Sequence, residues 1–290
     1  MLNLDLFRES KRKLEGIKYF MDQLGRHGLD WTWWYFQFTN RVLSLYYRGK
    51  TNTGIYIMER PWDNLIILDA CRYDAFKYKF EKEKAFFKDF KVSLEKVYSR
   101  GSCTSEFLLE NFAGKQYKDV IYITANPYVY TLLPRSTFFK VIHLWRTHWD
   151  DDLGTVHPRY VFKKALEIHR IYPSKRLIIH FMQPHPPFIG KYRKNGSLFC
   201  SIALKEGLVE AIKAYLSNLD LVFSYTKLLV KMLDGITVIT SDHGEAWGEF
   251  ALPFTIPVYG HPSFIRIPSI REVPWLTIYK TRTTCMNRKC

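Results

Sequence analysis

The sequence predicts an α/β fold in which helices cover both faces of a mostly parallel central sheet. Short apolar runs typical of buried strands alternate along the chain with longer segments of helical spacing. Several of these runs end abruptly in polar residues, as strands do at the ligand-binding edge of an open α/β sheet. The composition, 47% hydrophobic and 24% charged over 290 residues, is long and apolar enough for a large globular core.

Four apolar runs are the clearest strand candidates, and a shorter fifth run covers residues 92–97. The four lie at residues 64–68 (NLIIL), 119–124 (DVIYIT), 176–181 (RLIIHF) and 236–240 (ITVIT). Nearly unbroken β-branched runs are typical of parallel strands that are buried on both faces. His180 lies inside one of these runs and is predicted to be a core residue.

Helices are predicted between these strands. The spacing of apolar residues indicates helices over 107–112, 159–171 and 208–233, the last without an internal proline. Residues 134–158 carry few regular signals and are expected to form a loop or insertion. Together these elements predict one large α/β domain over residues 51–290, the candidate catalytic domain, preceded by an appendage at residues 1–50.

The appendage is predicted to be helical and rich in aromatic residues. Residues 4–25 have amphipathic spacing, and residues 31–47 carry a dense run of Trp, Tyr and Phe. This run is too short and too polar to span a bilayer. It either packs on the catalytic domain, which we favour, or rests on a lipid surface as a peripheral membrane contact with its rings at headgroup level.

The charge balance favours anionic partners. Lys and Arg total 43 against 28 Asp and Glu, which gives a net charge of +15. The basic residues are scattered and form no nucleic-acid-binding motif, so we expect no nucleic-acid partner. Five cysteines without a CxxC pair, of which Cys285 and Cys290 have no evident partner, and a charged N-terminus predict a cytoplasmic protein.

Polar residues follow the predicted strands. Asp242 and His243 come directly after residues 236–240 and offer a carboxylate oxygen and an imidazole nitrogen to one metal ion, with Gly244 allowing a sharp turn. Asp69 follows the first strand, and Thr104 opens a helix after a Ser-Cys loop. Because parallel strands end at one edge, these residues are expected to converge. Asp69 as a turn residue and Thr104 as a plain helix cap are the alternatives.

Five motifs in order resemble the alkaline phosphatase superfamily, and most closely its sulfatase-like and phosphodiesterase-like branches. They read LDACRYDAF, SRGSCTSEF, HFMQPHPPF, TSDHGE and YGHP, and they span residues 64–262. The resemblance implies that Asp69, Asp242 and His243 are metal ligands. It also implies that Thr104 is the nucleophile, with its oxygen a further ligand; Cys103 lacks the flanking residues of a formylglycine site.

The resemblance also assigns roles to two histidines. His261 matches a late histidine that serves a metal or phosphate, and His185 matches a histidine placed against the transferred oxyanion. Structural roles at a proline-flanked loop are the alternatives for both. Arg72 is predicted to pair with the same anion, or else with Asp74. One divalent metal site is expected and a second is possible, with zinc or manganese favoured by mixed carboxylate, imidazole and hydroxyl ligands.

The function expected from these features is a metal-dependent hydrolase. It would cleave an anionic phosphate or sulfate ester, phosphate favoured, through a covalent ester on Thr104. The first alternative is a transferase that moves a phospho-headgroup between lipid and glycan at a membrane surface, motivated by residues 31–47 and the basic charge. The second is a non-catalytic, anion-binding homologue.

Overall fold

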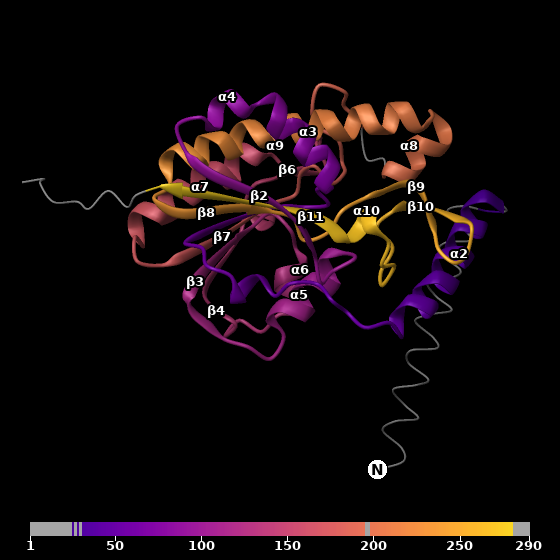
Figure 1. The fold of residues 1–290 in the computed structure, drawn as a ribbon, viewed down its shortest axis with the longest axis horizontal. Helices are drawn as coiled ribbons and strands as arrows, with labels where there is room; N and C mark the ends of the chain where they lie inside the picture. The colour runs from indigo at the N-terminus through magenta and orange to yellow at the C-terminus, as the bar shows by residue number, and fades with distance from the viewer. Residues whose placement is uncertain (1–24, 26–27, 29–30, 195–197, 281–290) are drawn as a thin grey trace, which may run out of the picture.

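A seven-stranded sheet runs through the middle of the molecule (Figure 1). The computed structural model describes residues 25, 28, 31–194 and 198–280. The strand order is β2 (Lys91–Tyr98), β11 (Glu272–Lys280), β8 (Gly235–Thr240), β1 (Asn64–Leu68), β7 (Arg176–Phe181), β3 (Tyr117–Thr124) and β4 (Phe138–His143). Only β11 is antiparallel to its neighbours in this sheet. The predicted fold class is therefore confirmed, with one antiparallel strand added.

Strand β1 occupies the centre of the sheet because its side chains are apolar on both faces. It pairs in parallel with β7 and β8, and all five of its residues are buried. Side chains alternate between faces along a strand. Ile66 and Leu68 accordingly join the core on one side of the sheet, whereas Leu65 and Ile67 join the core on the other.

Helices cover both faces of the sheet (Figure 1). One face carries α3 (Tyr73–Lys82), α4 (Lys84–Phe87), α7 (Pro158–Ile171), α8 (Phe199–Lys205) and α9 (Leu208–Met232). The opposite face carries α5 (Thr104–Phe112), α6 (Tyr128–Leu132) and the short 3₁₀ helix η1 (Ile57–Glu59). Aromatic side chains fill much of both cores, as the edge-to-face pairs Phe76–Phe223 and Phe112–Phe138 illustrate.

Helix α2 (Trp31–Arg48) packs on a hairpin beside the main sheet. Its buried residues Leu43 and Tyr47 meet a small core formed with β9 (Ala246–Ala251) and β10 (Ile256–Gly260), and the Tyr47 hydroxyl donates to the Leu252 carbonyl at 2.7 Å. Phe38 and Leu45 face solvent, and the peripheral membrane contact given as the alternative for residues 31–47 stays untested. No helix among the described residues is long and apolar enough to cross a membrane. The helix predicted over residues 4–25 lies almost wholly outside them, and the domain boundary at residue 50 also stays a prediction.

Two regions differ from the sequence-based expectation. The expected loop at residues 134–158 contains the edge strand β4, the 3₁₀ helix η2 (Leu144–Arg146) and the two-residue strands β5 (Trp149–Asp150) and β6 (Thr155–Val156). The C-terminal part contains a helical turn, α10 (Pro268–Arg271), followed by β11, for which we made no prediction.

Candidate metal centre and nucleophile

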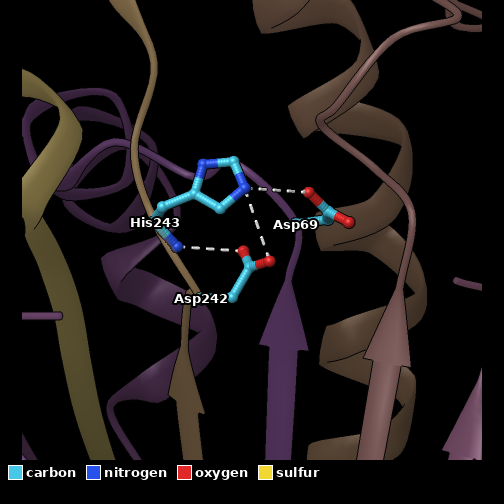
Figure 2. A group of neighbouring side chains, drawn as sticks. All are labelled: Asp69, Asp242 and His243. Carbon is cyan, nitrogen blue, oxygen red and sulfur yellow. Dashed lines mark hydrogen bonds and ion pairs between the residues drawn. The ribbon is translucent and has the colours of Figure 1, made fainter. Parts of the chain in front are cut away.

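Asp69, Asp242 and His243 come together where β1 and β8 end. The two strands are parallel neighbours, so the residues that follow Leu68 and Thr240 leave the sheet at the same edge. One ligand atom of each residue lies within 4.8 Å of the others, and all three side chains are buried. Figure 2 shows both carboxylates facing the His243 ring. The structure therefore joins the three predicted ligands in one cluster.

The backbone around the cluster fixes the orientation of Asp242. Its Oδ1 accepts hydrogen bonds from the amides of Ala70 at 3.1 Å and His243 at 3.0 Å. Ala70 has a φ of +60°, a strained conformation for a residue other than glycine, and it follows Asp69 directly. Gly244 is required because a Cβ atom there would lie 2.2 Å from the Ser269 carbonyl oxygen. These bonds leave Oδ2 of Asp242 pointing into the cluster.

Thr104 places its hydroxyl against this carboxylate. It is the first residue of α5, and its Oγ1 donates to Asp242 Oδ2 at 2.8 Å. The same oxygen lies 3.4 Å from Nε2 of His243 and 3.5 Å from Oδ2 of Asp69. A cavity of about 430 Å³ opens beside it, lined also by His185 and His261. The predicted nucleophile thus touches all three predicted ligands and faces open space.

The electrostatics of the cluster fit a bound cation. Burial and then the charge of Asp69 raise the pKa of Asp242 to about 6. Burial alone would raise the pKa of Asp69 as well, but the charge of His185 and the interaction with His180 hold it below its ordinary value. Two carboxylates buried side by side repel each other, which a divalent ion between them would relieve.

The His243 ring supports the same conclusion. Burial and the neighbouring His261 lower the pKa of His243 to about 3, so the imidazole is neutral. Its Nδ1 lies 2.8 Å from the Gly244 carbonyl, which assigns the proton to Nδ1 and leaves the Nε2 lone pair facing the carboxylates. Among the residues that the structure describes, the Oδ1 atom of Asp69 is buried without a hydrogen-bond partner. This unpaired oxygen and the imidazole lone pair beside it match the ligand set of a divalent metal.

His185 and His261 lie next to one another above the cluster. The centroid of the His261 ring is 4.4 Å from that of His243 and 5.0 Å from that of His185. Burial alone would lower the pKa of His261, but the Glu245 carboxylate, 2.8 Å from its Nδ1, raises it to about 9. The His261 imidazolium and the His185 ring therefore line the cavity in which an anion would bind.

Arg72 is not brought into this cluster. Its guanidinium pairs with Asp74 and Glu249, each at 2.6 Å, and stacks over the Trp247 ring at 3.9 Å. A further bond to the Glu245 carbonyl, at 2.9 Å, uses another of its donors. Arg72 therefore holds an ion-pair network around Trp247, as in the alternative reading of the sequence, and it does not line the cavity beside Thr104.

Two residues of the cluster were not predicted from the sequence. Asn126 follows β3, and its Nδ2 donates to Asp69 Oδ2 at 2.8 Å; its place after an apolar run is the signal that could have found it. His180 is buried inside β7, as expected of a core residue, but its Nε2 lies 3.6 Å from Asp69 Oδ2 and 3.8 Å from Asp242 Oδ2. Its Nδ1 lies 2.9 Å from the Tyr122 hydroxyl.

Replacing Tyr122 with phenylalanine is expected to weaken divalent-metal binding by about tenfold or more. Nε2 of His180 faces the two carboxylates, which assigns the imidazole proton to Nε2 and leaves Nδ1 to accept from the Tyr122 hydroxyl, 2.9 Å away. Without that bond the imidazole can turn or change tautomer, whereas the phenylalanine ring keeps the packing. Competition with a chromophoric chelator measures the affinity. Tyr117→Phe, on the same strand, is the matched control, and equal losses in both variants would contradict the assignment.

The fold has counterparts among solved structures. An integral membrane phosphoethanolamine transferase, EptA from Neisseria meningitidis, matches with a TM-score of 0.52 and 14% identity over 80% of this chain and 49% of that one. The C-terminal periplasmic domain of EptC from Escherichia coli, in complex with zinc, matches with a TM-score of 0.51 and 16% identity over 75% and 72%. The present chain thus spans about half the length of the EptA chain.

Other comparisons add little. An alkaline phosphatase superfamily protein from Vibrio parahaemolyticus matches at a TM-score of 0.42 and 13% identity, over 84% of this chain and 69% of that one. Neither the scan against protein-family models nor the search of curated proteins returns a match.

The predicted cytoplasmic location is wrong in the light of these comparisons, since the similar EptC structure is a periplasmic domain. The cysteine pattern and the charged N-terminus were weak grounds for it. The cysteine pattern argues only against a disulfide framework, and a periplasmic domain does not require one. At the level of the fold, these matches agree with the resemblance seen in the five motifs: the chain shares the fold of the EptA and EptC structures, and its candidate ligands lie at the carboxyl edge of the sheet.

Proposed function

We propose that the chain is a metal-dependent phosphotransferase that moves a phospho-headgroup onto an acceptor hydroxyl through a covalent ester on Thr104. The observation that carries this proposal is the position of the Thr104 hydroxyl. It donates to Asp242 at 2.8 Å, lies within 3.5 Å of Asp69 and His243, and borders a cavity. A threonine hydroxyl needs this kind of surrounding to react at neutral pH.

The metal would be held by Asp69, Asp242 and His243, with the Thr104 oxygen beside them. When bound, a zinc or manganese ion would lower the pKa of the hydroxyl and neutralise the ester oxygens. The geometry of three buried ligand atoms within 4.8 Å and the mixed carboxylate and imidazole set support zinc, which the similar EptC structure contains.

The chain's own residues support two successive displacements. In the first, Oγ1 of Thr104 loses its proton to solvent and forms a bond to phosphorus while the bond to the departing alcohol breaks, and that alcohol takes up a proton. His261, protonated next to Glu245, lies at the cavity and can supply this proton. In the second, the acceptor hydroxyl gives its proton to His261 and forms the new bond to phosphorus while the bond between phosphorus and Oγ1 breaks, and Oγ1 regains a proton from solvent.

Transfer, the first alternative drawn from the sequence, is preferred here to hydrolysis. The two similar structures with a TM-score above 0.5 belong to phosphoethanolamine transferases. The cavity beside Thr104 also has an apolar rim, formed by Tyr128, Trp149 and Met182, which can seat the carbon body of an acceptor and displace water. Hydrolysis would use the same residues with water as the acceptor, so the distinction lies in the second step.

The test is a turnover assay with a p-nitrophenyl phosphodiester, in which protein loaded with zinc or manganese is mixed with increasing ethanolamine or glycerol. Transfer predicts that nitrophenol release rises with the acceptor and that the headgroup appears on the acceptor. If release is independent of the acceptor and the product is always the hydrolysed ester, the protein is a hydrolase. No release with either metal would favour the non-catalytic homologue.

A further inference from the structure

We propose that a second cavity, between α6 and β4, binds an anionic group of the substrate. It has a volume of about 270 Å³ and lies against the outer strand of the sheet. Arg135, Arg146, Tyr130 and His143 supply its polar lining. None of these residues belongs to the cluster around Thr104 or to the cavity beside it.

Two arginines converge there without a carboxylate. Arg146 and Arg135 lower the pKa of Tyr130, and all three side chains line the same cavity. Arg146 is also stacked over the Tyr130 ring at 4.0 Å and lies 5.0 Å from the centre of the Trp145 ring. Stacking holds the guanidinium in place before any ligand arrives.

The absence of an acidic partner sets this pair apart from other arginines of the chain. Arg60, Arg100 and Arg176 each pair with a carboxylate at 3.0 Å or less. Within the described ranges, 31–194 and 198–280, no Asp or Glu side chain forms an ion pair with Arg135 or Arg146. Two like charges held near one another raise the free energy of the empty site, and an oxyanion would lower it through bidentate bonds.

His143 offers a further unused polar group. Its Nδ1 is buried and has no hydrogen-bond partner in the described part of the chain. Burial, followed by the charges of Arg146 and Arg135, lowers the pKa of His143, so the ring is neutral and can donate one N–H to an anion. A buried polar atom without a partner in the wall of a basic cavity is the feature expected of a ligand site.

The floor of the cavity is apolar and narrows the class of ligand. Val129, Phe138 and Val141 line it beneath the arginines. A cationic rim above an apolar floor suits an oxyanion joined to a small carbon skeleton, such as a polyol phosphate. The volume of about 270 Å³ is just below the usual range for small-molecule sites, which begins at about 300 Å³, so the ligand is small.

Helix α6 connects this cavity to the one beside Thr104. Tyr128 lines the cavity that contains Thr104, whereas Val129 and Tyr130 line the second cavity. A substrate whose anionic group sits on Arg135 and Arg146 can therefore extend past α6 toward the hydroxyl. This part of the inference rests on the proposed function, and it assigns the acceptor to the phosphorylated polyols or glycans; binding of the anion does not depend on it.

Binding is tested with Thr104→Ala protein in the presence of a chelator, so that neither the metal nor the nucleophile contributes. Calorimetric titration with glycerol phosphate is expected to show binding that Arg135→Gln/Arg146→Gln weakens by about tenfold or more. Lys77→Gln/Lys82→Gln removes the same charge from exposed positions of α3, on the other face of the sheet, and should change the affinity by less than about twofold. Equal affinity in the two double variants, or no binding at all, would overturn the proposal.

A second variant distinguishes the contribution of the apolar floor to binding from that of the two arginines. Val141→Phe fills the apolar floor and leaves both arginines, so it should weaken glycerol phosphate while sparing inorganic phosphate. In the zinc-loaded protein with Thr104 intact, the arginine double variant should raise KM for glycerol phosphate as acceptor and leave turnover with glycerol unchanged. Protein that binds glycerol phosphate as expected but transfers nothing would refute the proposed function and retain the anion site.

Discussion

Thr104→Ala is expected to lower kcat for phospho-transfer by about 10³-fold or more, because no other hydroxyl occupies its position among the ligands. Oγ1 of Thr104 is held by Asp242 at 2.8 Å at the first residue of α5. Water replacing it would lack both the covalent anchor and the orientation that the helix provides. Nitrophenol release from the p-nitrophenyl phosphodiester, measured at saturating acceptor, gives kcat for each variant.

The controls for this prediction separate chemistry from folding. Thr104→Ser keeps the hydroxyl and should recover activity to within about tenfold of the wild-type rate, the loss reflecting a freer rotamer. Ser224→Ala removes an exposed hydroxyl from α9 and should have no effect. An alanine variant at position 104 that keeps a rate close to that of the wild type would exclude Thr104 as the nucleophile.

Asp242→Asn is expected to reduce divalent-metal affinity by more than about 100-fold, beyond the loss typical of residues that only orient ligands. Asparagine can keep the bonds that Oδ1 accepts from Ala70 and His243, but it removes the negative charge that faces Thr104. In the wild-type protein, metal at about 1,000 times its dissociation constant should add about 4 kcal/mol to the free energy of unfolding. In the variant this increment should largely disappear.

Without metal, the order of stability between the wild type and Asp242→Asn should be reversed. Without a cation the charges of Asp69 and Asp242 repel each other in a buried site, so the variant is expected to be at least as stable as the wild type in the presence of a chelator. Thermal unfolding with and without metal measures both effects. Asp119→Asn, at the opposite end of β3, is the matched control and should leave the metal increment intact. An unchanged metal increment in Asp242→Asn would contradict the assigned ligand set.

The strands at the centre of the sheet were the most predictable part of the fold. The runs NLIIL and RLIIHF correspond to β1 and β7 with the same limits, because parallel strands buried on both faces must be apolar throughout. Because β1 and β8 are parallel, the residues that follow them, Asp69 and Asp242, lie at the same carboxyl edge of the sheet. The convergence of these residues followed from the strand order alone.

Strands β4 and β11 were not predictable on the same grounds. Strand β4 is half-exposed, and Lys140 interrupts its apolar residues, so its sequence does not indicate a strand buried on both faces. Strand β11 contains Pro274, which argues against a strand within a sheet. The structure accommodates this proline because pairing with β8 begins only at Trp275, while Pro274 lies opposite Lys96 of β2.

The residues of the site also divide into those that the sequence predicts and those that it does not. Asp69, Thr104, Asp242 and His243 carry their own sequence signals, since each follows a strand or opens a helix at the functional edge. The orientations of His180 and Arg72 depend instead on residues that are distant in sequence. The Tyr122 hydroxyl contacts Nδ1 of His180 and so orients Nε2 toward the carboxylates. The ion pair with Glu249 holds Arg72 outside the cavity. No local pattern encodes those contacts.

The central claim is that Thr104 carries the phospho-headgroup during turnover. Intact-protein mass spectrometry, after zinc-loaded protein is mixed with the p-nitrophenyl phosphodiester and quenched in acid without an acceptor, tests it most directly. The account predicts one added headgroup per chain, located on Thr104 by peptide fragmentation and absent from Thr104→Ala. Rapid turnover with no adduct, or an adduct on Cys103 or Ser105, would contradict it.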